Sequence, residues 1–329
     1  MRPIILAAAF VAAVPVSAQS DFRPVATYSI VARDAATGQL GVAVQSHWFS
    51  VGPLVAWAEA GVGAVATQSF VDPAYGPLGL ELMRSGRSAP ASLEALLHTD
   101  DGEAVRQVAM VDASGRVAAH TGSGAIQAAG HYLGDGYSVQ ANMMEHDTVW
   151  PAMAHAFEST EGDLAERMLA ALEAAQAEGG DIRGKQSAAI LIVAGESTGR
   201  PWVDRLVDLR IEDHAEPIAE LRRLVRMHRA YTAMNEGDGH MTTGDIPTAI
   251  AKYNQAMDLL PDEATNGEAP FWVGVTFASV GQVDEAIPYL QRAQRQDTRW
   301  AELMRRLPAA GLLPDDPALL DRLIAAMRE

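Results

Sequence analysis

The sequence predicts an α+β fold followed by a smaller all-α module. Between residues 27 and 211, strand-like and helix-like segments come in separate blocks instead of alternating one by one. Such blocks indicate antiparallel sheets covered by helices and argue against a doubly wound parallel sheet. After about Pro217 the segments are almost all helical. With 329 residues, of which 48% are hydrophobic, the chain is long enough to form two domains with real cores.

The first block begins with a β-hairpin. Its two runs, Thr27–Arg33 and Leu40–His47, alternate small or apolar residues with β-branched ones, and the turn Asp34–Gly38 separates them. A third strand follows at Gly61–Gln68. The hairpin therefore begins on a threonine.

The later elements of this part are predicted from periodicity and start signals. Helices are expected to begin near Tyr75 and near Ser88, where a serine precedes Pro90 in the first turn. The remaining segments are the strands Gln107–Val111, Arg116–Thr121 and Tyr137–Gln140, the helices at about Thr148–Glu158 and Asp163–Ala177, and the strands Gln186–Ala194 and Val207–Ile211.

The C-terminal part contains two similar helical segments. Gly244–Pro261 resembles the second helix of a tetratricopeptide repeat, and Gly281–Ala293 repeats its spacing 37 residues later (Gly244 to Gly281), close to the length of about 34 that is typical of that repeat. The polar, glycine-containing stretch 229–241 predicts a linker between a domain at 27–228 and a helical domain at 242–329. The helical domain either packs on the first domain or binds a protein partner.

Composition and the N-terminus favour an exported protein. Residues 1–18 have the layout of a secretory signal peptide, which would leave residues 19–26 as a short leader. No later segment reaches about 18 uninterrupted apolar residues, so no membrane contact is expected after signal cleavage. The net charge of −17 argues against nucleic acid or an anionic membrane as a partner, and the lack of cysteine excludes disulfides and thiolate sites. The expected location is periplasmic or secreted.

Thr27 is the candidate nucleophile. A threonine at the first position of a buried strand, behind a removable leader, is typical of an N-terminal nucleophile (Ntn) hydrolase. In such enzymes the hydroxyl attacks the substrate, and the α-amine of the same residue acts as the base. The other interpretation is that Thr27 is an ordinary strand residue.

Five segments carry a resemblance to a known family. They are Thr27–Asp34, Gly41–Ser46, Trp57–Gln68, Tyr75–Leu80 and Gln186–Ala189. Together they resemble the bacterial and archaeal family called domain of unknown function 1028, over roughly residues 27 to 228. That family is grouped with the Ntn-hydrolase-like proteins, so the resemblance implies a four-layer α-β-β-α sandwich. It implies no substrate, because a fold does not fix a function.

Four further residues are candidates for the site. Ser46 and His47 end the second strand, where proteasome-like relatives carry polar or charged groups beside the nucleophile. Gln68 ends the third strand, from which an amide can reach an oxyanion, and Asn142 follows a strand in a segment that resembles the one returning polar side chains to the threonine. Each of these is also consistent with an ordinary polar residue at a strand end.

One feature departs from the proteasome-like pattern. Those relatives carry a prominent lysine on a neighbouring strand, whereas this chain has only two lysines, Lys185 and Lys252. His47 is the candidate to take that role, and a histidine at the rim of the site is the other interpretation. The missing lysine argues against both catalysis by Thr27 and self-cleavage of the leader.

No cofactor or metal site is expected. The stretch Gly179–Gln186 has the glycine and lysine spacing of a phosphate-binding loop, but it lacks the Ser or Thr after the lysine. It also follows a predicted helix and precedes a strand, which is the reverse of the order in a phosphate-binding loop. Gly61 and Gly63 lack the third glycine of a dinucleotide motif. The nine histidines show no ligand spacing. His120, His131 and the run Glu145–Asp147 could meet in space as a metal site, but solvated loop residues are the favoured interpretation.

The sequence is consistent with two alternative functions. The first is an exported amidohydrolase or peptidase that uses Thr27 on an unknown peptide or small-molecule amide. The second is a non-enzymatic binding protein whose helical tail recruits a protein partner. The missing lysine and a leader that stays attached would both favour the second.

Overall fold

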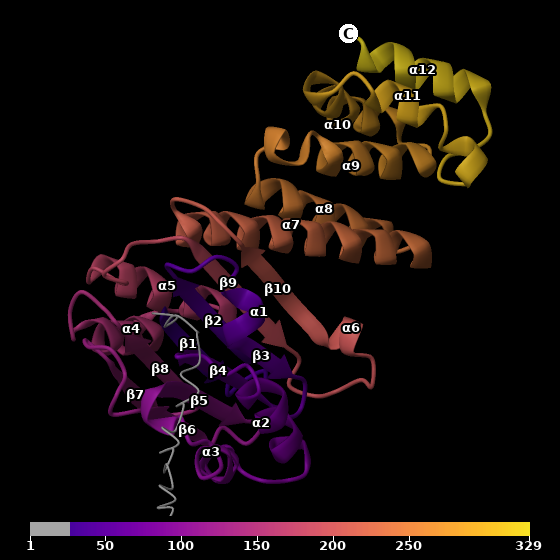
Figure 1. Cartoon of the computed structure of the whole chain (residues 1–329). Helices are drawn as coiled ribbons and strands as arrows, with labels where there is room; N and C mark the ends of the chain where they lie inside the picture. Colours follow the sequence, from indigo (N-terminus) through magenta and orange to yellow (C-terminus); the bar gives the residue numbers. More distant parts are fainter. Residues whose placement is uncertain (1–26) are drawn as a thin grey trace, which may run out of the picture.

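The computed structural model of the chain describes residues 27–329, so the expected signal peptide and leader lie outside the described residues. Figure 1 shows two regions, one with the β-sheets and their helices and one with the C-terminal helices. The mixed α/β architecture with a helical C-terminal region confirms the fold class predicted from the order of the blocks.

The larger sheet has six strands, and all neighbouring strands are antiparallel. Their order across the sheet is β10-β9-β2-β1-β8-β7. β1 and β2 form the expected hairpin, at the centre of this sheet. The strands are β1 (Thr27–Arg33), β2 (Leu40–Ser46), β7 (Gly130–Gly134), β8 (Tyr137–Asn142), β9 (Ser187–Val193) and β10 (Arg205–Ile211).

The smaller sheet has four antiparallel strands in the order β3-β4-β5-β6. They are β3 (Ala56–Glu59), β4 (Gly63–Ser69), β5 (Arg106–Asp112) and β6 (Val117–Thr121). An apolar core lies between the two sheets, which includes Val31 and Val42 of the larger sheet and Ala64 and Val111 of the smaller one. The sheets therefore pack face to face.

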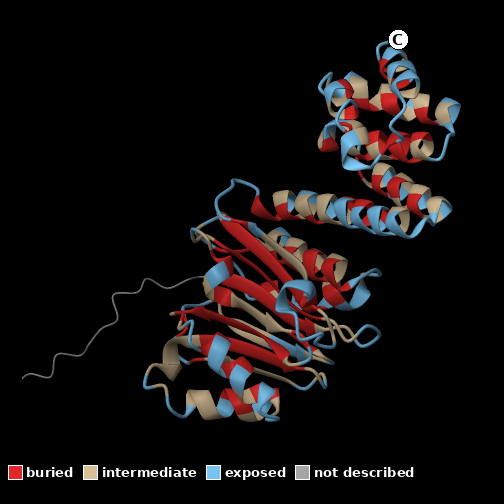
Figure 2. Ribbon diagram, turned by 90° about the vertical axis from the view of Figure 1, so that its right-hand side faces the viewer, coloured by how far each residue is buried: buried red, intermediate tan, exposed pale blue. Residues whose placement is uncertain are grey.

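Helices cover the outer face of each sheet (Figure 2). α4 (Val149–Ser159) and α5 (Leu164–Ala177) pack on the larger sheet, and α2 (Tyr75–Arg84) and α3 (Ala89–Leu97) pack on the smaller one. Ser88 caps α3 as predicted, because its side chain accepts a hydrogen bond from the amide of Ala91. The short helices α1 (Gly52–Val55), η1 (Glu103–Val105) and α6 (Pro201–Asp204) lie in connections.

The stretch 229–241 is helical, which corrects the prediction of a linker there. It forms the second half of the long helix α7 (Pro217–Thr243), which ends at Gly244 in the left-handed conformation. Gly237 suggested a loop, yet it lies where α7 meets α8, and a Cβ at this position would come within 2.9 Å of the Tyr253 ring. Close helix packing explains this glycine better than chain flexibility does. The division into two domains stays a prediction.

The C-terminal region consists of packed helices. α8 (Ile246–Leu259) and α10 (Val283–Gln296) form where the repeated spacing predicts helices, and α9 (Glu268–Ser279) lies between them in the sequence. α7 joins both regions, because Leu221 and Val225 belong to the core over the larger sheet while Ala230 and Ala233 belong to a core shared with α8. The remaining elements are η2 (Asp262–Thr265), α11 (Trp300–Met304), η3 (Pro308–Ala310) and α12 (Pro317–Met327).

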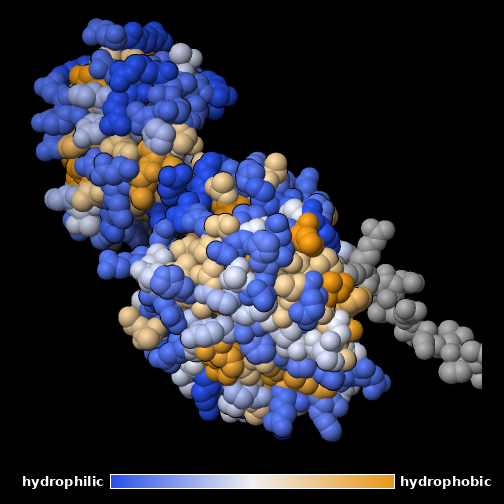
Figure 3. All heavy atoms as spheres, turned by 90° about the vertical axis from the view of Figure 1, so that its left-hand side faces the viewer, coloured by the Kyte–Doolittle hydropathy of each residue, from blue (hydrophilic) through white to orange (hydrophobic). Residues whose placement is uncertain are grey.

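The surface differs between the two regions. On the face shown in Figure 3, the C-terminal helices are mainly hydrophilic, and the region around the sheets carries more apolar and intermediate residues. Within residues 27–329, no helix has both the length and the apolar character needed to cross a bilayer.

Candidate functional site

Polar residues form a row across one end of the larger sheet, on the face that looks toward the smaller sheet. Thr27 is the first residue of β1, and the register pairs it with Ser46 at the end of β2 and with Asn142 at the end of β8. Ser46 in turn pairs with Ser187 at the start of β9. All four residues are fully buried. Antiparallel pairing thus brings together strand ends that lie far apart in the sequence.

A second polar row faces the first one from the smaller sheet. The register of this sheet pairs Gln68 of β4 with Gln107 of β5, and Gln107 with Thr121 of β6. The amide Nε2 of Gln68 donates to Oε1 of Gln107 at 2.7 Å, and the amide Nε2 of Gln107 donates to Oγ1 of Thr121 at 2.9 Å. The two rows close the space between the sheets at this end.

Hydrogen bonds join Thr27 to both rows. Its Oγ1 donates to Oγ of Ser46 at 3.2 Å, and its carbonyl oxygen accepts from Nε2 of Gln68 at 3.2 Å. Asn142 Nδ2 lies 3.5 Å from the same carbonyl oxygen and donates to Oε1 of Gln107 at 2.9 Å. Of the five predicted site residues, the structure therefore brings Thr27, Ser46, Gln68 and Asn142 into one hydrogen-bonded cluster.

The network extends further between the sheets. Ser29 Oγ donates to Oε1 of Gln68 at 2.6 Å, and Gln140 Nε2 donates to Oγ of Ser29 at 2.6 Å. Ser138 Oγ donates to Oε1 of Gln140 at 2.9 Å. Buried polar groups are costly unless they are paired, and these bonds satisfy most of the network. Asn142 Oδ1 is an exception, because this buried oxygen has no partner among the described residues.

His47 lies at the edge of the cluster. Its backbone N–H donates to Oδ2 of Asp181 at 2.9 Å. Its ring Nδ1 is buried and has no hydrogen-bond partner within the described part of the chain. His47 thus contacts the loop before β9 through its backbone, and among the described residues its ring Nδ1 makes no hydrogen bond to Thr27.

That loop supplies a cation that the sequence reasoning missed. The carboxylate of Asp181 is fully buried, and Arg183 binds both of its oxygens, with Nε at 3.1 Å from Oδ1 and Nη2 at 2.9 Å from Oδ2. Burial raises the pKa of Tyr28 well above its usual value, and the charge of Asp181 adds to this effect. Asp181 therefore lies close to both neighbours of the Thr27–Ser46 pair, Tyr28 and His47. The signal in the sequence was a pair of opposite charges directly before a predicted strand.

The polar row ends at a histidine on β7. Oγ1 of Thr121 and Nδ1 of His131 are 2.8 Å apart, which extends the network from Gln107 toward the edge of the larger sheet. Burial lowers the pKa of His131, and the nearby His120 lowers it further, so this imidazole is neutral near pH 7. Among residues 27–329, no group of three or more His, Asp or Glu side chains could hold a metal ion.

Comparisons with known proteins identify a family for most of this region. The model of a family of unknown function, DUF1028, matches residues 27–221. The crystal structure of a DUF1028 protein from Silicibacter pomeroyi is similar, with a TM-score of 0.55 and 30% sequence identity, and the match covers 61% of this chain and 88% of that one. No curated protein matches the chain. The matched range contains all five predicted site residues, and the chain belongs to the DUF1028 family.

Proposed function

We propose that this protein is an exported Ntn-hydrolase-like enzyme that cleaves an amide bond in a peptide or small acylated compound. In this proposal the two facing sheets and their outer helices form the four-layer sandwich of the Ntn hydrolases. One observation carries it. The hydroxyl of Thr27 stands at the first position of a central strand and donates to Oγ of Ser46, in a buried cluster of hydroxyl and amide groups.

The mechanism requires that the chain is cut between Ala26 and Thr27, because the base is the α-amine that this cleavage frees. The amine takes the hydroxyl proton as Oγ1 attacks the carbonyl carbon of the substrate, and it returns the proton to the leaving amine. Water then releases the acyl group from Oγ1. Export and removal of residues 1–18, followed by removal of the leader 19–26, would supply this N-terminus.

In this proposal the burial of Thr27 takes the place of the missing lysine, because burial disfavours the charged form of an amine, lowers its pKa and keeps it neutral enough to accept a proton. The ion pair of the buried Asp181 and the partly exposed Arg183 has no net charge, so it does not replace the lysine as a cation. Arg183 is linked to the cluster through Asp181, whose carboxylate accepts from the backbone of His47, next to Ser46. In this proposal the ion pair positions His47 and the end of β2.

The amides of Gln68 and Asn142 are the donors available to an oxyanion. Both now point at the carbonyl oxygen of Thr27 and at Gln107. Donors that already have protein partners must exchange them when the charge develops on the substrate, so a substrate is expected to displace part of this network.

The N-terminus of the mature protein tests the proposal. Intact-mass spectrometry of the exported protein is expected to show a chain that begins at Thr27. A mature chain that begins at Gln19 would leave the α-amine in a peptide bond, and the mechanism would fail. Hydrolysis of a panel of peptide and acyl amides by the Thr27 form is the second measurement.

A second candidate function is a non-enzymatic binding protein. It is favoured by the burial of Thr27 and by the two amides that approach its carbonyl oxygen, because a purely structural residue would be held in the same way. In that case the C-terminal helices would recruit a protein partner as a tetratricopeptide-like module. A Thr27-terminated protein without activity on any amide would support this candidate.

A further inference from the structure

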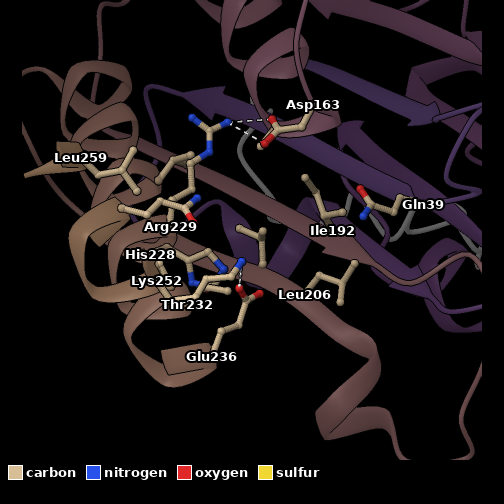
Figure 4. A pocket seen from close by; sticks show the side chains of 15 residues that line it. Gln39, Asp163, Ile192, Leu206, His228, Arg229, Thr232, Glu236, Lys252 and Leu259 are labelled. Carbon is tan, nitrogen blue, oxygen red and sulfur yellow. Dashed lines mark hydrogen bonds and ion pairs between the residues drawn. The ribbon is translucent and has the colours of Figure 1, made fainter. Parts of the chain in front are cut away.

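A cavity lies where the C-terminal helices meet the larger sheet (Figure 4). Its volume is about 470 Å³, within the range of about 300–1,000 Å³ that is usual for small-molecule sites. Gln39 lines it at the turn of the β1–β2 hairpin, and Thr27 lies at the other end of the seven-residue strand β1, about 20 Å away by strand length. The cavity is therefore separate from the Thr27 cluster.

The floor of the cavity is apolar and its rim is charged. Aliphatic side chains come from the sheet and from two helices, namely Ile192, Leu206, Val207, Val225 and Leu259. The rim carries two ion pairs, which Figure 4 shows on opposite sides. Thr232 and Gln255, which carry a hydroxyl and an amide, also line the cavity.

The two ion pairs differ in how firmly they are held. Arg229 of α7 binds both oxygens of Asp163 at 2.7 and 2.9 Å and also reaches Glu166 at 3.3 Å, so it clamps α7 to α5. Among residues 27–329, Lys252 of α8 pairs with a single carboxylate, that of Glu236 on α7, at 2.5 Å, and both side chains are partly exposed. Exposed ion pairs of this kind contribute little to stability. Lys252 and Glu236 can therefore separate and each bind a ligand group at a low cost in free energy.

We propose that this cavity binds a small zwitterion with a branched aliphatic side chain, of the free amino acid class. The ligand carboxylate would pair with Lys252, its ammonium group with Glu236, and its side chain would cover the aliphatic floor. The four rim charges of Arg229, Lys252, Asp163 and Glu236 sum to zero, so the rim offers no net attraction to a singly charged compound. This inference is independent of the proposed hydrolysis.

The chain offers a direct readout, because it has only two lysines. Reductive ¹³C-methylation labels both while keeping their charge, and Lys185→Arg assigns the two lysine signals. Lys185 is a matched internal control, since it also pairs with one glutamate, Glu216, at 2.5 Å and is exposed to a similar degree (29% against 32%). Leucine is expected to shift the Lys252 signal and to leave the Lys185 signal in place.

Partial ligands test the class of compound on the full chain. 4-Methylpentanoate carries only the acid and isoamylamine only the amine of leucine, and glycine lacks the side chain. Each is expected to bind at least about 10-fold more weakly than leucine, a loss of about 1.4 kcal/mol. Equal binding of either singly charged compound would overturn the assignment, and so would leucine at millimolar concentration without any shift at Lys252.

A pair of variants tests the residues by calorimetry. Glu236→Gln keeps the shape of the side chain and removes its charge, so leucine affinity should fall at least about 10-fold. Glu216→Gln makes the same change at the other lysine and should leave affinity unchanged. Melting temperatures show that both variants fold. If Glu236→Gln binds leucine as well as the unmodified protein, the ammonium group does not pair with Glu236 and the proposal is wrong.

Discussion

The two ends of the space between the sheets are built from the same strands, but they differ in chemistry. On β2, Leu40 belongs to the apolar core between the sheets, whereas Ser46 ends the strand in the polar cluster. On β5, Val111 lies in the apolar core, whereas Gln107 sits at the centre of the hydrogen-bond network. The change occurs within a single face of each strand.

The apolar end stabilises the fold, whereas the polar end holds hydrogen-bonding groups in fixed orientations. The free energy of apolar packing is non-directional and scales with the area that is buried. The apolar end therefore stabilises the fold without fixing the orientation of individual groups. A buried hydrogen-bond network fixes the direction of every donor, and an unpaired group within it is costly. We therefore expect substitutions at the apolar end to act mainly on stability, and substitutions at the polar end to act on chemistry with a smaller loss of stability.

The largest expected effect is on activity at Thr27. If Thr27 is the nucleophile, Thr27→Ala should abolish hydrolysis, by at least about 10³-fold, together with any autocatalytic removal of the leader. Thr27→Ser should retain part of both, because its hydroxyl occupies nearly the same position. Turnover and the N-terminal mass of both variants are the measurements.

Stability serves as the control for this pair. Thr27→Ala removes the hydrogen bond to Ser46 and should cost no more than about 1–2 kcal/mol. Thermal melts of both variants check this. An Ala variant as active as the unmodified protein would falsify the catalytic assignment, and equal mild effects of both changes would indicate a strand residue.

The next effect concerns the apolar end. Leu40 is fully buried between the sheets, so Leu40→Ala should lower the free energy of unfolding by about 2–5 kcal/mol. Leu40→Met keeps the volume and should cost less than about 1.5 kcal/mol. Denaturant unfolding measures both. A loss below about 1 kcal/mol for the alanine variant would contradict this expectation. It would show that neighbouring side chains fill the space left by Leu40, or that the apolar end contributes little to the free energy of unfolding.

A smaller loss of stability is expected at the polar end. Gln107→Ala removes the acceptor of the Gln68 and Asn142 amides and the donor to the Ala141 carbonyl, at a cost of about 1–3 kcal/mol. The exposed Gln255→Ala serves as the control, with a change within about 0.5 kcal/mol. If Gln107→Ala matches this control, water replaces the lost partners and the polar end is not fixed by the network.

Elements with a local signal could be predicted from the sequence. The strands β1 and β2 follow from alternation, and α5 begins where Asp163 accepts from the amide of Glu166. The sequence does not predict β7, because this strand at the edge of its sheet has no fully buried residue and no alternation. The local sequence predicts a linker at the end of α7, because Gly237 is required by a neighbouring helix that this stretch does not reveal.

The candidate site could be predicted only in part, for a similar reason. Ser46 and Asn142 end strands, so their type and place were visible in the sequence. Gln107 gains its central place from the register between β4 and β5, and Asp181 arrives from a loop 134 positions after His47. Partners that meet through register and long-range packing leave no local pattern, so the sequence could not assign these roles.

The smallest expected effect is a pH dependence at the outer limit of the polar end, where His131 meets Thr121. Burial holds the pKa of His131 below its usual value, so the folded protein resists protonation that the unfolded chain accepts. The stability that this histidine contributes is thus fully present above about pH 6.5, the usual histidine pKa, and is lost as pH falls through the folded pKa.

We expect the melting temperature to fall between pH 7 and pH 5, and this fall to be smaller in His131→Gln, which cannot titrate. Carboxylates with lowered pKa values, such as Asp100 and Glu166, also lose stability on acidification, but they do so equally in both proteins. The difference between the two pH profiles therefore isolates His131. Parallel profiles would show that the imidazole is as accessible to protons as in the unfolded chain, and the network would then end at Thr121.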